Sequence, residues 1–244
     1  MAKKKKISRK QLLKEPDEIL TTTARIFQFA VRYRYPLLGV LGGLILIVVV
    51  ISAVRYHAIA RENDSFAGLQ TAWQNYRQQA QSTDPQTAYQ SVESEFDALL
   101  DRFGGSRGGK YATLVFADIS FEAGRIDRAL EFYQQALEDL EVPEIRNRIH
   151  NAMGYAYEAK GDLPAAAGQF EQVLGGSAAA FQEEARYNLG RLYAELGKPR
   201  ESRTAYETLL AENPNTLYAG MIREQLATSL SAGDATSPPQ APGN

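Results

Sequence analysis

One glycine-rich segment of this chain contains residue types that could support catalysis. Gly104–Gly108 reads G-x-S-x-G, a pattern that can present the hydroxyl of Ser106 as a nucleophile on a strand-to-helix turn. The overlapping segment Gly104–Lys110 approaches G-x4-G-K, in which backbone amides and a lysine bind phosphate. Tyr111, however, stands where a serine or threonine would hold magnesium. The two patterns raise acyl transfer and nucleotide hydrolysis as hypotheses.

The elements expected around this segment suit neither reaction. Both motifs follow a strand in the proteins that use them, whereas the FDALLDRF directly before Gly104 has helical spacing. The one later histidine, His150, lies inside a helical pattern. We therefore predict a flexible glycine connector between helices, and a protein that is not an enzyme. Catalysis by Ser106 or Lys110 is kept as the minor alternative.

The rest of the composition restricts site chemistry further. The 244 residues include no cysteine and two histidines. Disulfides, thiolate zinc sites, cysteine nucleophiles and covalent haem attachment are excluded within this chain, and a histidine-built metal site is disfavoured. We expect no cofactor and no metal.

Three evenly spaced glycines indicate a repeat. Gly124, Gly161 and Gly197 are 37 and 36 residues apart, and each interrupts a helical pattern rich in alanine and tyrosine at the same point. A period of this length is typical of a solenoid of helix pairs, in which each glycine can adopt the left-handed conformation that ends a helix. Binding is therefore expected rather than catalysis.

The residues around these glycines resemble the tetratricopeptide repeat, W-x2-L-G-x2-Y followed by A-x3-F and P. The similarity covers roughly residues 110 to 216. Thr113, His150 and Arg186 replace the tryptophan, and each repeat has two or three extra residues. The resemblance implies an all-α fold, an α-solenoid whose first helices line a peptide-binding concave face. The matching positions include Met153, Gly154, Tyr157, Ala166, Phe170, Leu189, Gly190, Tyr193, Tyr206 and Pro214.

Helical patterns extend the array at both ends. In residues 55–106 an aromatic stripe containing Phe66, Trp73 and Tyr76 predicts a degenerate helix pair with these rings in its core, and Asp84-Pro85 should start the second helix. Residues 107–230 would form the repeat solenoid. It would end in a capping helix over 216–230 with Leu217, Met221, Ile222 and Leu226 on one side, and a disordered tail would occupy 231–244.

An uncharged apolar run precedes the array. Leu37–Val54 is long enough to cross a bilayer core of roughly 30 Å as one helix. We therefore expect a transmembrane helix over residues 35–54. A cleaved signal peptide is the alternative, because Ala58-Ile59-Ala60 has the form of a cleavage site. The long basic region before the run and the length of the run favour an uncleaved anchor.

Charge asymmetry predicts the orientation of this helix. Residues 1–34 contain ten lysines or arginines and three acids, whereas residues 55–244 carry a net charge of −9. The positive-inside rule then predicts a cytoplasmic N-terminus and, in a bacterium, a periplasmic repeat domain anchored by a single pass in the inner membrane. We expect Lys3–Lys6 to contact anionic lipid, and an amphipathic segment after Pro16 to lie along the membrane as an interfacial helix. No base-reading module accompanies the basic arm, so nucleic acid is not an expected partner.

Two sets of residues are predicted to contact partners. Gly39 and Gly43 would allow another membrane helix to approach closely. Alignment to the repeat pattern places a mixture of aromatic, apolar and charged side chains on the concave face, which suits polypeptides; homo-oligomers are left open. These residues are Tyr111, Leu114, Asp118, Phe121, Arg148, Asn151, Tyr155, Glu158, Tyr187, Asn188 and Arg191.

The full layout, from basic arm to acidic repeat domain, resembles the YfgM-type family. Lys110-Tyr111-Ala112 and EAGRIDRALEFYQQAL are the local matches. This resemblance implies an ancillary subunit of the Sec translocon that associates with periplasmic chaperones or exported chains. The alternative is an assembly scaffold of another envelope complex, for secretion, respiration or the cell wall.

Overall fold

The computed structural model describes residues 18–234, and the burial of side chains over residues 24–228. The predicted lipid contacts of Lys3–Lys6 and most of the predicted tail lie outside these residues. The chain divides into two compact units, residues 1–60 and 61–244. Every described residue lies in a helix, a turn or a short connection, and none lies in a strand.

The first unit contains α2 (Glu18–Arg32) and the beginning of α3 (Arg34–Ala80). The helices are separated at Tyr33, where Pro36 has no N–H to donate to the carbonyl of Arg32, four residues earlier. All side chains of Leu37–Val54 are exposed in this unit. Among the described helices, α3 is the one that is long and apolar enough to cross a membrane.

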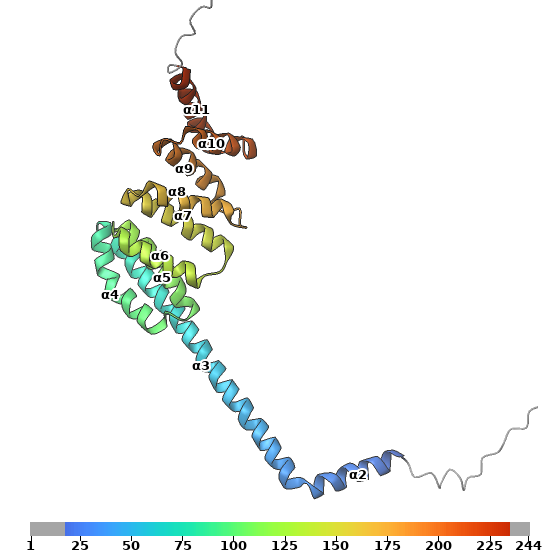
Figure 1. Ribbon diagram of the computed structural model, residues 1–244. Coiled ribbons are helices and arrows are strands. Elements are labelled where there is room, and N and C mark those ends of the chain that lie inside the picture. Colours follow the sequence, from blue (N-terminus) through green and yellow to red (C-terminus); the bar gives the residue numbers. More distant parts are fainter. Residues whose placement is uncertain (1–17, 235–244) are drawn as a thin grey trace, which may run out of the picture. The chain divides into compact units, whose positions relative to one another are not determined.

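Over residues 61–234, the second unit contains the end of α3 and eight further helices, which follow one another as a stack of helix pairs (Figure 1). The closest packing lies within the pairs α5–α6, α7–α8 and α9–α10. The helices are α4 (Pro85–Phe103), α5 (Arg107–Glu122), α6 (Ile126–Asp139), α7 (Pro143–Lys160), α8 (Leu163–Gly175), α9 (Gln182–Glu195), α10 (Pro199–Glu212) and α11 (Ala219–Asp234).

The turns inside the pairs confirm the prediction for the three repeat glycines. Gly124, Gly161 and Gly197 have φ angles of 72°, 84° and 71°. At the end of α7, the N–H of Gly161 donates to Glu158 O at 2.8 Å, and the next N–H donates to Tyr157 O. Only a residue that tolerates positive φ can end the helix this way.

The predicted start of α4 is also confirmed. Asp84 caps the helix by accepting the N–H of Thr87 at 3.1 Å, and Pro85 is the first helical residue, where no N–H is needed. The turn from α3 therefore occupies residues 81–84.

The core consists of successive clusters in which small residues admit large rings. A Cβ added at Gly154 of α7 would lie 2.6 Å from the ring of Phe170 on α8, so the glycine lets the two helices approach. In the first cluster Phe96 and Tyr89 of α4 stack on Phe116 of α5, with ring centroids 4.7 and 5.5 Å apart. Such contacts bury each pair against the next.

Expectations about four individual residues are wrong. Trp73 and Phe66 are exposed, by 38% and 41%, whereas Tyr76 of the same stripe is buried. Leu217 is 93% exposed because it precedes α11, and Met221 is also exposed; the buried residues of that helix include Ala219 and Ile222.

Only the first part of the glycine segment, residues 104–106, connects two helices. Gly108 and Gly109 belong to the first turn of α5 and are buried, because α5 begins against α3 and the end of α4. A Cβ on Gly108 would collide with Ser65 of α3, and one on Gly109 with the backbone of Phe103. These glycines allow close packing rather than flexibility.

Candidate functional site

The residues of the glycine segment are engaged in structural contacts. Ser106 is buried; its hydroxyl donates to Phe103 O at 2.7 Å and accepts the N–H of Gly109 at 3.1 Å, which caps α5. Lys110 Nζ lies 3.3 Å from the carboxylate of Asp139. The arrangement gives Ser106 no general base and places Lys110 in an ion pair, so neither motif has the context of its chemistry.

Metal chemistry has no candidate centre in residues 18–234. No group of three histidine, aspartate or glutamate residues there is arranged to hold an ion.

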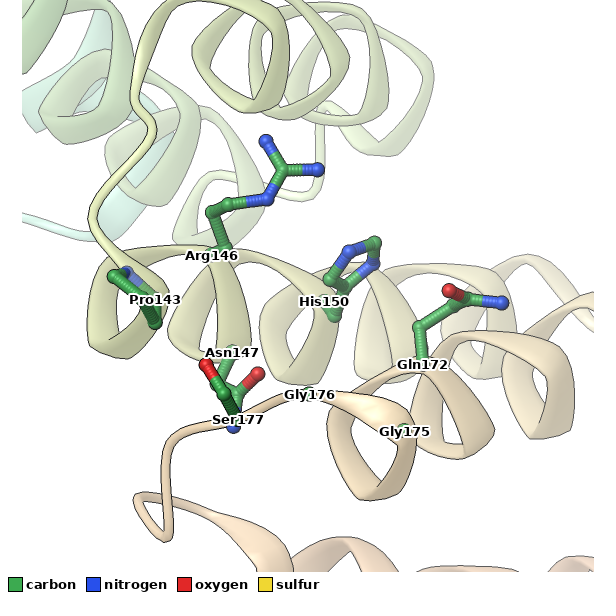
Figure 2. A pocket seen from close by; sticks show the side chains of 8 residues that line it. All are labelled: Pro143, Arg146, Asn147, His150, Gln172, Gly175, Gly176 and Ser177. Carbon is green, nitrogen blue, oxygen red and sulfur yellow. The ribbon is translucent and has the colours of Figure 1, made fainter.

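A hollow of about 290 Å³ lies between the start of α7 and the loop after α8 (Figure 2). Its polar side chains support the fold. Arg146, which points away from the loop in Figure 2, donates to carbonyls at the end of α6. Asn147 is buried and donates to Ala178 O at 2.8 Å, and His150 Nδ1 lies 2.9 Å from Gln169 Oε1. We therefore interpret this hollow as structural.

A second hollow, of about 360 Å³, lies on the face formed by α3, α5, α7 and the start of α9, the first helix of each pair. We call this surface the first-helix face. Aromatic rings alternate there with carboxylates and one arginine. The lining residues are Trp73, Asp118, Phe121, Glu122, Tyr133, Arg148, Asn151, Ala152, Tyr155 and Phe181.

Polar contacts join α5 to α7 in this hollow. Arg148 donates to Asp118 at 2.5 Å, and the hydroxyl of Tyr133 donates to the other oxygen of Asp118 at 2.8 Å. Both members of the ion pair remain partly exposed, so its contribution to stability is small. The pair links two neighbouring first helices.

A second set of contacts joins α7 to α9. Tyr155 donates to Glu184 at 2.6 Å and accepts from the amide of Asn188 at 2.8 Å. Arg191 donates to Glu158 at 2.6 Å. Together with the contacts between α5 and α7, these bonds form a polar ladder across the first-helix face.

Two tyrosines of the hollow, Tyr133 and Tyr155, have raised pKa values. The pKa of Tyr133 is raised well above its usual range by burial, and then by the charge of Asp118. Burial also raises the pKa of Tyr155, with a further contribution from its hydrogen bond to Glu184. Both hydroxyls therefore stay protonated and act as donors to carboxylates at physiological pH.

The structure brings together part of the predicted binding set. Asp118, Phe121, Arg148, Asn151 and Tyr155 all line the hollow.

The other predicted binding residues lie elsewhere or in structural contacts. Leu114 belongs to the core between α5, α6 and α7, and Asn188 is also buried. Tyr187 stacks on Tyr218 at 4.3 Å, and Tyr111 packs near Phe66 at the base of α5. Glu158 and Arg191 pair with each other beyond the hollow.

Five lining residues were absent from the predicted set: Trp73, Glu122, Tyr133, Ala152 and Phe181. Trp73 was assigned to the core, because helical spacing alone does not tell which neighbour covers an aromatic stripe. Glu122 lies one residue after the predicted Phe121, and Phe181 lies in the inter-pair loop with φ of 66°. The one sequence feature that could have indicated this hollow was Trp73, in the aromatic stripe before the first repeat.

The glycines of the apolar run have open surroundings. A Cβ at Gly39 or Gly43 would meet no atom within 4 Å among the described residues. Nothing in the described part of the first unit, residues 18–60, therefore requires glycine at these positions.

Helix pairs with left-handed glycines at their inner turns and a continuous face of first helices define an α-solenoid of the tetratricopeptide type. Comparison with protein families agrees with this geometry. The model of the tetratricopeptide repeat-like domain matches residues 38–230, and the chain belongs to that family.

Solved structures show the same fold. The tetratricopeptide-like repeats of a putative kinesin light chain from Podosopora anserina are 19% identical, with a TM-score of 0.56, over 69% of this chain and 87% of that one. A repeat protein from Parabacteroides merdae is 16% identical, with a TM-score of 0.56, over 69% of this chain and 62% of that one. The C-terminal part of a repeat protein from Cytophaga hutchinsonii is 14% identical, with a TM-score of 0.52, over 75% of this chain and 73% of that one. No curated protein matches the chain.

Proposed function

We propose that the protein is a non-enzymatic, membrane-anchored scaffold that binds polypeptides on its first-helix face. The observation that carries this proposal is the joint presence of a repeat solenoid and Leu37–Val54, an uncharged helical segment with every side chain exposed. An exposed apolar surface of this size is unfavourable in water, and a lipid bilayer would bury a helix of this length.

The flanking residues support an anchor rather than a cleaved leader. The first unit places Phe27 and Phe29 exposed on α2, directly before the apolar segment. Arg25, Arg32 and Arg34 lie in the same stretch. Exposed aromatics beside arginines suit the headgroup region, so α2 would lie in the cytoplasmic interface of the inner membrane.

The acidic solenoid would then face the periplasm. The layout and the charge asymmetry favour an ancillary subunit of the Sec translocon, where exported chains or periplasmic chaperones would be the bound polypeptides. An assembly scaffold of another envelope complex would have the same anchor and the same face. The identity of the membrane partner distinguishes the two functions.

Co-purification from mildly solubilised membranes tests the proposal. A C-terminally tagged chain is compared with a matched variant in which Leu37–Val54 is replaced by an unrelated apolar helix of equal length. We expect translocon subunits and periplasmic chaperones to be enriched with the native chain, as measured by quantitative mass spectrometry. Gly39→Leu with Gly43→Leu should reduce the membrane partners if those glycines contact another helix.

Three results would change or contradict the proposed function. Enrichment of a different envelope complex without the translocon would replace the translocon role by the second function. A chain recovered from the soluble fraction in its uncleaved form would contradict the anchor. A recovery of no polypeptide partner by either chain would contradict the scaffold function itself.

A further inference from the structure

The hollow on the first-helix face has an excess of negative charge. Arg148 is paired with Asp118, so these two charges offset each other. Glu122 lines the hollow, and Glu184 is hydrogen-bonded to the lining residues Tyr155 and Asn151. In the described part of the chain neither glutamate forms an ion pair with a lysine or arginine.

A buried acceptor in the same hollow has no partner. Asn151 is 6% exposed, and its Oδ1 forms no hydrogen bond with any described residue, while its amide nitrogen donates to Glu184 at 3.3 Å. An unsatisfied buried acceptor is unfavourable, and a ligand that donates a hydrogen bond there would remove the penalty. The hollow therefore contains a buried acceptor that none of its own donors satisfies.

The walls add aromatic faces. Trp73 is partly exposed and stacks on Tyr76, whose hydroxyl donates to Glu122 at 2.5 Å. Phe121 and Phe181 complete the aromatic lining. Rings beside carboxylates attract cations, both through the ring quadrupole and by charge.

We propose that this hollow binds a lysine or arginine side chain of a polypeptide partner. The cation would lie against Trp73, face Glu122 and Glu184, and donate to Asn151 Oδ1 after a small rotation of that side chain. This inference rests on the proposed function, because it specifies which polypeptides the first-helix face selects.

Trp73 is the only tryptophan of the chain, so its emission reports on the hollow directly. The full chain in non-ionic detergent is titrated with caesium and with iodide. Each quenching constant is divided by that of free N-acetyltryptophanamide with the same ion, because caesium is the intrinsically weaker quencher of indole. We expect this ratio to be larger for caesium than for iodide, and Glu122→Gln with Glu184→Gln to reduce the difference between the two ratios. The matched control, Glu131→Gln with Glu207→Gln, removes two exposed charges on α6 and α10 and should leave it unchanged. An equal or larger ratio for iodide in the native chain would overturn the proposal.

Binding is then measured by fluorescence anisotropy with labelled short peptides that differ only in carrying lysine, glutamine or glutamate at the same positions. We expect the lysine peptide to bind about tenfold more tightly than the glutamine peptide, and the double variant at Glu122 and Glu184 to abolish this preference while the control keeps it. Circular dichroism verifies that each variant is folded.

Two results distinguish this inference from the proposed function. Equal binding of all three peptides, lost in Trp73→Ala, would refute the cation preference and leave polypeptide binding by this face intact. A lack of binding by every peptide, in a chain that also recovers no polypeptide partner from membranes, would overturn both.

Discussion

At the scale of single residues, glycines do two different things in this fold. Gly154 is required because the ring of Phe170 occupies the space of a Cβ, whereas an added Cβ at Gly168 of α8 would meet nothing within 4 Å. The two positions are both helical, so only their surroundings differ. Their substitutions should therefore have opposite effects on stability.

We expect Gly154→Ala to lower the free energy of unfolding by about 1–3 kcal/mol, through overpacking against Phe170. Gly168→Ala should raise it by about 0.5–1 kcal/mol, because alanine restricts the unfolded chain and favours helix. Denaturant unfolding followed by circular dichroism measures both. A neutral Gly154→Ala would mean that Phe170 moves aside freely.

Ser106 provides a second test at this scale. Its hydroxyl caps α5, so Ser106→Ala should lower the free energy of unfolding by about 1 kcal/mol, while peptide binding by the folded chain stays unchanged. Ser94→Ala on the exposed side of α4 is the control and should not lower the free energy of unfolding, because alanine favours helix more than serine does. A folded, fully stable Ser106→Ala chain that had lost its function in cells would instead support the catalytic alternative.

At the scale of elements, the turn glycines were predictable and the packing around them was not. Gly161 was identified because a period of 36 or 37 residues and the need for positive φ can both be read from one sequence. Burial of Leu114 and Asn151 depends on how successive pairs rotate against each other, which spacing within one helix does not determine. For the same reason Trp73, on α3, was assigned to the core although it lines the hollow.

The conformation of Gly161 gives a prediction about the α7–α8 turn. Gly161→Ala should cost about 1–2 kcal/mol of stability, because an alanine Cβ is strained at φ of 84°. Gly161→Asn should cost less, since asparagine tolerates the left-handed region. Thermal unfolding of the two variants tests this order. Equal costs would indicate that the turn rearranges rather than bearing the strain.

At the scale of the whole molecule, tyrosines limit stability at alkaline pH. Burial raises the pKa of Tyr89, Tyr193 and Tyr206 to about 12, from an ordinary value near 10. A group whose pKa is raised on folding stabilises the fold fully below the unfolded pKa and loses that contribution as pH rises through the folded pKa.

The stability of the solenoid should therefore be constant with respect to these groups below about pH 10 and fall as pH rises through about 12. Tyrosinate absorbance of the native chain, compared with the chain in denaturant, measures the shift. If the native chain ionised all its tyrosines near pH 10 while remaining folded, the burial of these hydroxyls would be contradicted.

The absence of cysteine makes the predicted topology directly measurable, because a single introduced cysteine is a unique label. We expect Glu131→Cys, on the exposed side of α6, to react with a membrane-impermeant maleimide in intact bacterial cells. Lys4→Cys in the basic arm should react only after lysis. The reverse pattern would invert the proposed orientation.

The end of the solenoid differs from its beginning in how much it buries. The first cluster holds stacked rings of α4 and α5, whereas the last rests on Tyr206, Leu209 and Ile222, with α11 covering one side. In a linear array each pair is stabilised by its neighbours, so local opening should start at α11 and proceed inward. Amide hydrogen exchange would then be fastest in α11 and slowest around Phe116, and a polypeptide that bound the last pair would be held by the most easily unfolded part of the molecule.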